Sequence, residues 1–328
     1  MSNPQYSVIA PVYNEEETLP EFYRQIKETM DSTNESWEII LINDGSRDRS
    51  WEIMQELRKN DPRVKILSFA KNFGHQPAVT AGLDFTMGNA VVMIDSDLQD
   101  PPSVILDMIV KWKEGYDLVY GVRSERKGET WFKEVTAKLF YRIIFHITDV
   151  NIPLDTGDFR LMDRKVVDVL QSMRERHRFI RGMTVWIGFK QAGVEYVREE
   201  RFAGTTKYPF KKMFKFALDA ITSFSYVPLQ IATYFGFSIA GLSAIGTLFV
   251  VYARLFMINH EFTGQATTLV AVLFLGGIQL ITLGIMGEYL GRIYDEVKGR
   301  PLYVVRDMQG FEDSHVAETY YRSLKHVQ

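Results

Sequence analysis

The chain has 328 residues, a formal net charge of −3 at pH 7 and a sequence pI of about 6.1. This length is enough for one large domain or two smaller ones, and the weak negative charge argues against a nucleic-acid-binding protein, which is usually strongly basic. With no cysteine, the chain can form neither disulfide bonds nor thiolate metal sites. Its first residues, MSNPQYSVIAPVYNEEE, lack the basic region and long apolar core of a signal peptide, so we expect none.

From residue 6 to residue 122, short apolar segments alternate with segments that have the spacing of amphipathic helices. This alternation is typical of a mainly parallel sheet with helices on both faces, so we predict an α/β fold. The predicted strands are 6–12, 37–43, 64–69, 90–95 and 117–122, and the predicted helices include 16–30 and 50–60.

Four polar clusters follow the first four predicted strands. In chain order they read NEE, NDGS, KNFGHQ and DSDLQD. Ligands of such sheets bind at the carboxyl ends of the strands, so the clusters predict one composite site. Because the chain has neither the glycine-rich dinucleotide fingerprint nor the P-loop motif, a dinucleotide-binding fold or a P-loop kinase is not supported.

The fourth cluster brings Asp95, Asp97 and Asp100 within six residues, directly after an apolar run. Hard oxygen ligands at a strand end suit Mg²⁺ or Mn²⁺, which are commonly held by one or two carboxylates together with substrate phosphates. Such an open metal site would neutralise a leaving diphosphate. A solvated acidic turn is the alternative, because aspartate is frequent in turns.

Two segments in the middle of the chain have apolar stripes at helical spacing. In 131–148 the stripe recurs every four residues, and in 206–226 it lies opposite a row of lysines. Basic amphipathic helices beside membrane spans usually lie in the interface, and we predict this for 206–226. For 131–148, an interfacial helix and ordinary core packing are equally open.

Two long stretches without Asp, Glu, Lys or Arg follow, at 220–253 and 262–287. Because about 20 apolar residues cross a bilayer core, we predict an integral membrane protein with two transmembrane helices; a buried hairpin in a soluble protein is the alternative. Lysine and arginine flank the stretches but are missing from the loop between them, which predicts that both termini are cytoplasmic. Small residues at every fourth position favour either a homo-oligomer or close packing of the two helices.

Together, the segments SVIAPVYNEEETL, ILINDGSRDRSWEI, KNFGHQPAVTAGL and MIDSDLQDPP resemble the nucleotide-sugar domain of family 2 glycosyltransferases, which have the GT-A fold. The later segments DTGDFRLMDR and RFAGTTKYPFKKM are similar to those of polyisoprenyl-phosphate glycosyltransferases, most of all bactoprenol glucosyltransferases. The resemblance implies a Rossmann-like, cytosolic GT-A catalytic domain at 1–205 and a juxtamembrane amphipathic helix at 206–226. A two-helix transmembrane hairpin at 227–292 and a cytosolic tail at 293–328 would complete the chain.

The resemblance also implies roles for individual residues. Asp95 and Asp97 match the motif for metal and diphosphate, with Asp97 the more direct metal ligand and a catalytic residue. Asp44 matches the residue that reads the base, which would be uracil, and Gln99 with Asp100 would face the sugar or the acceptor. The other expected nucleotide-sugar residues are Pro11, Tyr13, Asn14, Glu15, Lys71, Asn72 and Arg123, the last at the leaving diphosphate.

Asp158 falls where related enzymes place a catalytic base. A polyprenyl phosphate has its second pKa near about 6 and is already anionic, so Asp158 would take a residual proton or orient the acceptor through Arg160. The alternative is that DFRLMDR begins a helix with Asp158 as its N-cap. Arg201 and Lys207 would hold the lipid phosphate, and His75 is a candidate to line the site.

The reaction that this resemblance implies is inverting transfer of one glucose from UDP-glucose to undecaprenyl phosphate at the cytosolic membrane face, with Mg²⁺ or Mn²⁺ as cofactor. A mannose, N-acetylglucosamine or aminoarabinose donor stays open, because sugar selectivity rests on few hydrogen bonds. A processive polysaccharide synthase is disfavoured, because two spans cannot form a channel and Glu175 stands where a tryptophan is expected. A non-catalytic, membrane-anchored nucleotide-sugar sensor is the remaining alternative.

Overall fold

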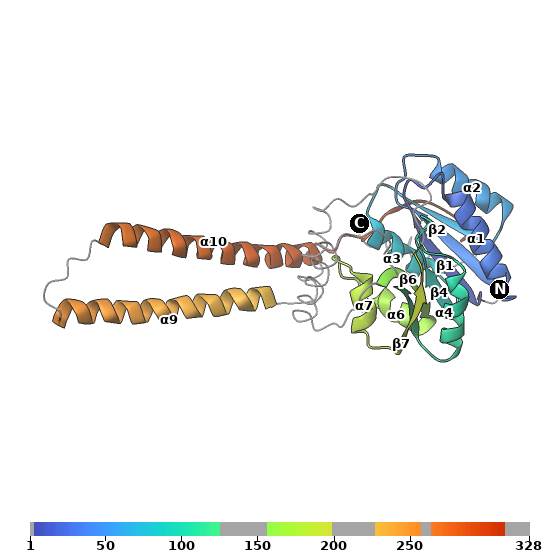
Figure 1. Ribbon diagram of the computed structural model, residues 1–328. Helices are drawn as coiled ribbons and strands as arrows, with labels where there is room; N and C mark the ends of the chain where they lie inside the picture. Colours follow the sequence, from blue (N-terminus) through green and yellow to red (C-terminus); the bar gives the residue numbers. More distant parts are fainter. Residues whose placement is uncertain (1–2, 125–155, 199–226, 257–263, 312–328) are drawn as a thin grey trace. The chain divides into compact units, whose positions relative to one another are not determined.

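Figure 1 shows the computed structural model of the chain, which describes residues 3–124, 156–198, 227–256 and 264–311. These residues belong to two compact units. We call the first the sheet unit; it is built from the two N-terminal ranges and from 300–311. The second, the hairpin unit, contains the rest.

An eight-stranded sheet runs through the sheet unit in the order β7-β5-β6-β4-β1-β2-β3-β8. Four pairs are parallel (β1–β2, β1–β4, β2–β3 and β5–β7) and three are antiparallel (β4–β6, β5–β6 and β3–β8). The predicted α/β fold with a mainly parallel sheet is therefore confirmed. The strands are β1 Tyr6–Val12, β2 Trp37–Asn43, β3 Val64–Phe69, β4 Ala90–Met93, β5 Leu118–Arg123, β6 Thr156–Asp163, β7 Gln191–Tyr196 and β8 Val305–Gln309.

Helices cover both faces of the sheet, and β1 shows how its residues divide between them. Val8 and Ala10 pack with Phe22 of α1 in one core cluster, whereas Ile9 lies against Gly82 of α3 on the opposite face. Because both faces are covered, the central strands are apolar almost throughout. The helices of this unit are α1 Leu19–Asp31, α2 Ser50–Asn60, α3 His75–Phe85, α4 Val104–Lys113, α6 Arg164–Ser172 and α7 Ile180–Trp186.

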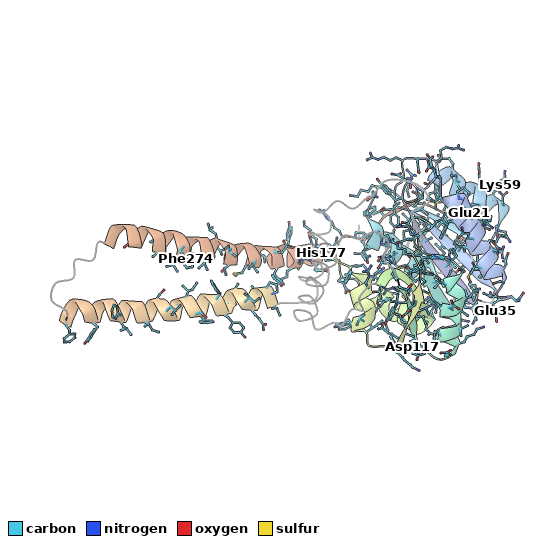
Figure 2. All side chains as sticks on the ribbon, viewed as in Figure 1. Glu21, Glu35, Lys59, Asp117, His177 and Phe274 are labelled. Carbon is cyan, nitrogen blue, oxygen red and sulfur yellow. The ribbon has the colours of Figure 1, made fainter. Side chains whose placement is uncertain are left out.

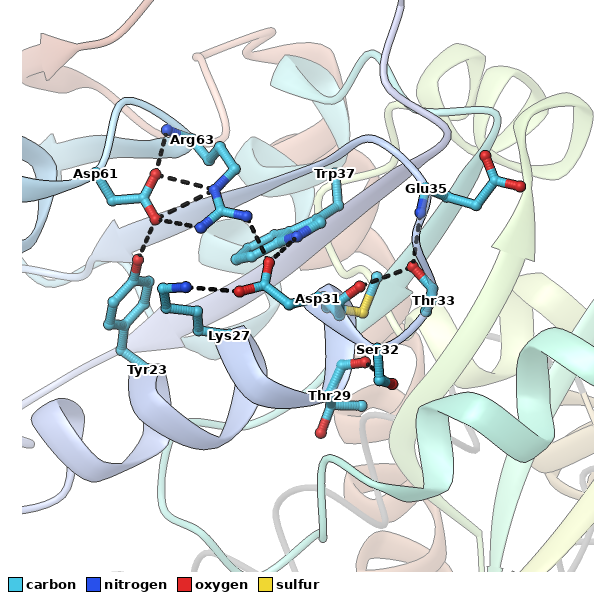
Figure 3. A network of polar contacts seen from close by, with 11 residues as sticks. Tyr23, Lys27, Thr29, Asp31, Ser32, Thr33, Glu35, Trp37, Asp61 and Arg63 are labelled. Carbon is cyan, nitrogen blue, oxygen red and sulfur yellow. Dashed lines mark hydrogen bonds and ion pairs between the residues drawn. The ribbon is translucent and has the colours of Figure 1, made fainter.

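A polar network ties α1 to the amino ends of β2 and β3 (Figure 3). Asp61 accepts hydrogen bonds from Arg63 Nη2 at 2.7 Å and from the Tyr23 hydroxyl at 2.6 Å. Arg63 also reaches Asp31 at 2.6 Å, and its guanidinium carbon lies 4.2 Å from the centroid of the Trp37 ring. Trp37 begins β2 and Arg63 directly precedes β3. The network therefore lies at the amino ends of these strands, whereas the polar clusters follow the carboxyl ends.

The segment DFRLMDR forms most of strand β6 and does not begin a helix. β6 pairs with both β4 and β5. The N-cap of α6 is Asp163, which accepts from the Lys165 backbone N–H at 3.1 Å. The interpretation of Asp158 as an N-cap is therefore wrong.

Part of the expected C-terminal tail belongs to the sheet. β8 pairs with β3, and the Tyr303 ring stacks on Phe69 with 5.2 Å between ring centroids. The Tyr303 hydroxyl also donates to Asp84 of α3 at 2.7 Å. The segment that follows the hairpin unit thus completes one edge of the sheet.

The hairpin unit consists of α9 Val227–Phe256 and α10 Gly264–Val297. By length and composition, Val227–Gly246 and Phe274–Val297 are candidate membrane spans. Their large apolar side chains are exposed, as Phe274 is at 61% (Figure 2). The segments predicted at 131–148 and 206–226 lie outside the described residues.

Candidate active site

The loops after β1 and β2 hold each other through Asn14. Its backbone N–H donates to Ser46 Oγ at 3.0 Å, and its side-chain oxygen accepts from the Arg47 backbone N–H at 2.8 Å. Asn14 has a φ of 54°, in the left-handed region that few non-glycine residues adopt. Tyr13 beside it is 36% exposed. Strain at a site-lining turn is typical of functional positions, and these contacts maintain it.

Asp44, at the end of β2, binds the loop that follows β3. Its buried carboxylate accepts from the backbone N–H groups of Phe73 at 2.7 Å and Gly74 at 3.0 Å, while Asn72 Nδ2 donates to the Asp44 carbonyl at 3.1 Å. Burial raises the pKa of Asp44 despite these backbone donors. Asp44 therefore holds the loop after β3 in place, in addition to any contact with the nucleobase of a donor.

Gly45 explains how closely these two loops can approach. It has a φ of +68°, and a Cβ at this position would lie 2.6 Å from the Asn72 backbone nitrogen. Only glycine satisfies both conditions without moving the backbone. The predicted site residues Asp44, Lys71 and Asn72 are thus brought together by the glycine of the NDGS cluster.

The acidic loop after β4 is fastened to β1. Ser96 Oγ donates to the Pro11 carbonyl at 2.8 Å, and Asp97 Oδ1 accepts from the Gln99 backbone N–H at 3.3 Å. Leu98 has a φ of 60°, a second non-glycine residue in the left-handed region at a strand end. The contact of Ser96 therefore fastens the segment that carries Asp95 and Asp97 to the end of β1.

Asp100 does not face the open site, because it is only 1% exposed. The Tyr196 hydroxyl at the end of β7 donates to it, and the guanidinium groups of Arg123 and Arg198 lie 4.0 Å and 3.9 Å away. Burial raises the pKa of Asp100, and the nearby Asp95 charge raises it further. Arg198 also donates to Gln99 Oε1 at 2.7 Å. This cluster anchors the acidic loop to β5 and β7.

A chain of alternating charges links the acidic loop to Asp158. His75 Nε2 lies 2.8 Å from Asp95 Oδ1, and His75 Nδ1 lies 3.8 Å from Asp158 Oδ2. Arg181 Nη2 donates to Asp158 Oδ1 at 3.1 Å. This row of charged groups starts in the loop after β4, includes the first residue of α3 and Asp158 on β6, and ends on α7.

This arrangement fixes the charge states of its members. Burial opposes the charge on His75, but Asp95 and Asp158 outweigh burial and raise the pKa of His75 to about 9. Burial also opposes the charge on Asp158, yet Arg181, His75 and Arg160 hold the pKa of Asp158 well below its usual range. At neutral pH, Asp158 is a carboxylate between two cations.

Arg160 is buried at 2% exposure, behind Asp158. Its Nη2 donates to the Gly157 carbonyl at 3.1 Å, its Nη1 to Thr184 Oγ1 at 2.5 Å and its Nε to the Asp158 carbonyl at 3.3 Å. Burial lowers the pKa of Arg160 to about 10, so the group stays charged at neutral pH. Its donors are directed into the protein, which leaves it no open edge for a ligand.

Sequence reasoning missed Arg181, Tyr196 and Arg198. Each lies well beyond the end of β6 and belongs to no motif, so only tertiary packing brings them to the acidic loop and to Asp158. His75, which the KNFGHQ cluster did indicate, lies between Asp95 and Asp158. Arg201 and Lys207 lie outside the described residues.

The acidic loop fits an open divalent-metal site rather than a closed one. Within the part of the chain that the structure describes, no group of three His, Cys, Asp or Glu side chains could hold a metal ion. Asp95 and Asp97 supply hard oxygen donors, and the Asp95 side chain is 34% exposed. Mg²⁺ and similar ions are commonly held by one or two carboxylates with waters and substrate phosphates, so this donor set suits such an ion.

Comparison with known proteins identifies the family to which the chain is similar. The family model described as Glycosyl transferase family 2 matches residues 7–170. The chain is 54% identical to an uncharacterized glycosyltransferase, YkcC, of Bacillus subtilis over 95% of this chain and 96% of that protein. It is 43% identical to an SfII prophage-derived bactoprenol glucosyl transferase of Shigella flexneri over 92% of this chain and 97% of that protein.

A solved structure is similar at low identity. The mannosyltransferase PcManGT from Pyrobaculum calidifontis, in complex with GDP-Man and Mn²⁺, gives a TM-score of 0.44 at 16% identity. The similarity covers 89% of this chain and 86% of that chain.

Proposed function

This chain belongs to glycosyl transferase family 2, and we propose that it transfers a single glucose from UDP-glucose to undecaprenyl phosphate, releasing UDP. The bactoprenol glucosyl transferases of Shigella, which match nearly the whole chain, support a lipid phosphate as acceptor. The polar loops that follow strands β1 to β4 of the sheet unit support a nucleotide sugar as donor. The same reaction with another nucleotide sugar is the second candidate.

The order of the strands carries this proposal. The loops assigned to the nucleotide follow β1, β2 and β3, which lie side by side; the acidic loop follows β4, next to β1. Asp158 lies on β6, on the other side of β4. A donor bound over β1–β3 would direct its diphosphate to the acidic loop, and an acceptor would then approach over β6. Donor and acceptor would thus meet from opposite sides of the anomeric carbon.

In the proposed reaction, an oxygen of the lipid phosphate attacks the anomeric carbon while the bond from that carbon to the diphosphate oxygen breaks. The electron pair of the broken bond leaves with UDP, and attack from the opposite face inverts the configuration to a β-linked lipid phosphate. Since the acceptor is already anionic at neutral pH, no residue needs to remove a proton first. The chain's task is to position the reactants and to balance charge.

Asp97 and Asp95 would hold the divalent cation, Mg²⁺ or Mn²⁺. Bound there, the ion would supply positive charge to the departing diphosphate. We assign Pro11, Tyr13 and Asn14 to the nucleotide side, together with Glu15, Asp44, Lys71, Asn72 and Gln99.

Arg123 is assigned to the leaving diphosphate. Its side chain is part-buried, and its guanidinium lies over Gly157, the residue before Asp158. A guanidinium binds phosphate oxygens with two parallel N–H groups, which suits a diphosphate.

The topology of the chain supports a membrane protein with both flanks on one side. β7 precedes α9 and β8 follows α10, and both strands belong to one sheet. If α9 and α10 cross a membrane, their outer ends must therefore be on the same side of it. The lysine and arginine content of the flanks favours the cytoplasmic side for the sheet unit and for both termini.

The decisive experiment is transfer to lipid by the purified full-length protein. Undecaprenyl phosphate is incubated with a panel of UDP- and GDP-sugars, with Mg²⁺ or with EDTA, and the extracted lipid is analysed by mass spectrometry. We expect a lipid-linked hexose from UDP-glucose only, absent with EDTA and with Asp97→Asn. Product from a different donor would replace glucose but keep the mechanism; no lipid product from any donor, despite nucleotide binding, would favour the sensor.

A further inference from the structure

The carboxylate of Asp158 is bound by one arginine from α7 rather than from its own strand. Arg181 Nη2 and Nε both donate to the same oxygen, Oδ1, at 3.1 and 3.3 Å. The second oxygen, Oδ2, faces His75 Nδ1 at 3.8 Å. The side chain of Arg181 is 19% exposed, so it is not fully enclosed, and its guanidinium contacts Asp158 along one edge.

α7 itself is fixed by contacts that do not involve Asp158. The backbone N–H of Ile180 donates to Gln76 Oε1 at the start of α3, at 3.0 Å. Thr184 Oγ1 accepts from the buried Arg160 and donates in turn to the Arg181 carbonyl at 3.0 Å. Arg160 therefore positions the helix that carries Arg181.

The other arginines near Asp158 and the acidic loop have different partners. Arg160 has its donors in the protein interior. Arg123 and Arg198 flank the buried Asp100, and Arg198 also binds Gln99. Among the arginines that the structure describes around Asp158, Arg181 is the one that donates hydrogen bonds to the Asp158 carboxylate.

A second anion beside Asp158 needs a compensating cation. The carboxylate would otherwise repel a phosphate at the same place, since like charges at close range destabilise each other. Arg181 can contact both anions, because a guanidinium has five N–H donors in a fixed fork and uses only one edge for Asp158. Such a guanidinium binds phosphate oxygens well.

We propose that Arg181 is the ligand for the phosphate of the lipid acceptor, and that Asp158 is the positioning residue that holds Arg181 in place. This inference rests on the proposed function, because it names the subsite at which the anionic acceptor of that reaction binds. It also gives Arg160 a role in the support of α7, in place of the direct contact with the acceptor that sequence reasoning suggested.

The test separates binding of the acceptor from turnover. Full-length protein is titrated calorimetrically with citronellyl phosphate, a short soluble isoprenyl phosphate, and separately with UDP and Mn²⁺. We expect Arg181→Gln to weaken citronellyl phosphate binding about tenfold or more, with UDP affinity within about twofold of wild type, because the lost donors serve only the acceptor. Arg181→Lys, which keeps the charge without the fork, should restore part of the affinity.

Arg174→Gln is the matched control, because it breaks another arginine–aspartate pair, with Asp84 at 2.8 Å, away from the site. It should leave both affinities unchanged. Equal citronellyl phosphate affinity in wild type and Arg181→Gln would overturn the proposal, and so would a loss of UDP affinity in Arg181→Gln as large as its loss of citronellyl phosphate affinity. If wild type binds citronellyl phosphate through Arg181 but transfers no sugar, the subsite stands and the proposed function fails.

Discussion

Asp158 is a fixed negative charge at neutral pH, because Arg181 and His75 face its two oxygens and Arg160 lies behind it. A group with so low a pKa is a poor acceptor of protons. Its contribution to transfer is then electrostatic and geometric, which agrees with an acceptor that carries its own negative charge.

Replacing this charge should affect transfer and leave donor binding intact. We expect Asp158→Asn to lower the rate of sugar transfer by about 10²–10³-fold, since the amide keeps the shape but releases Arg181 and His75. Affinity for UDP should change less than about threefold, because the residues that we assign to the nucleotide lie on the other side of β4 from Asp158. Steady-state rates and UDP titration measure both; transfer within tenfold of wild type would contradict the electrostatic role.

Gly157 offers a second prediction at the residue scale. A Cβ there would lie 2.6 Å from Arg123 Nη2, so Gly157→Ala must push the end of this side chain away. We expect a loss of transfer of about tenfold with little loss of stability, because a flexible side chain can move. In an Arg123→Ala background, Gly157→Ala should cost nothing further; additive losses in this double-mutant cycle would show that the contact is not the cause.

How far sequence predicts the site follows from these residues. Asp44, Asp95 and Asp97 could be assigned to the carboxyl ends of strands because each follows a strand within four residues, and parallel strands bring such ends together. Arg181 and Tyr196 could not, because their neighbours in the chain carry no motif and their positions depend on how α7 and β7 pack. The burial of these side chains could not be predicted from the sequence either. Asp100 and Arg160 are residue types that are common in binding sites, but both are buried.

At the scale of elements, the network of Figure 3 sets how α1 is held to the sheet. Burial alone would raise the pKa of Asp61, but Arg63 and Tyr23 outweigh it and hold the pKa well below its ordinary value of 3.8. A carboxylate with a depressed pKa stabilises the folded state above its unfolded pKa, and that stabilisation is lost as the pH falls through the folded pKa.

We therefore expect Asp61→Asn to lower the free energy of unfolding by about 1.5–3 kcal/mol at pH 7, the range for hydrogen bonds to charged groups. The difference from wild type should shrink as the pH falls below about 4. Urea unfolding at several pH values measures this difference. Glu52→Gln, at an exposed position on α2, is the control, and its free energy of unfolding should stay within about 0.5 kcal/mol of wild type. A difference between Asp61→Asn and wild type that grows in acid would refute the depressed pKa of Asp61.

The edge formed by β3 and β8 depends on Tyr303, which is 5% exposed and touches both Phe69 and Asp84. We expect Tyr303→Ala to cost about 3–5 kcal/mol, as for other buried aromatic residues. Tyr303→Phe, which removes only the hydroxyl, should cost about 1 kcal/mol. Hydrogen exchange followed by mass spectrometry should show faster exchange in β3 and β8 for the alanine variant; unchanged exchange there would mean that the edge does not depend on this residue.

Elements with a local signal were predicted well. β1, β2, β3 and α2 have the bounds expected from the sequence. β6 and β8 carry no such signal: each pairs with strands far away in the chain, and their residues mix charged with apolar types. Long-range pairing, rather than local propensity, decides such strands.

At the scale of the whole molecule, donor and metal should bind together. The acidic loop offers two carboxylates, and substrate phosphates would complete the coordination. We expect Mn²⁺ affinity, measured by electron paramagnetic resonance, to rise at least about tenfold when UDP is present, and EDTA to abolish transfer. Asp97→Asn should remove the rise; Asp107→Asn, at an exposed position on α4, should not. Equal Mn²⁺ affinity with and without UDP would exclude a shared site.

The return of β8 to the sheet has a consequence for biosynthesis. Arg306 contacts Ser68 across a separation of 238 residues, with both long apolar helices in between. During translation, β3 therefore leaves the ribosome before its partner β8 has been made. One edge of β3 stays unpaired until α9, α10 and β8 have been synthesised. The sheet can reach its complete fold only after α9 and α10 have left the ribosome, so synthesis of the hairpin unit precedes the pairing of the last strand.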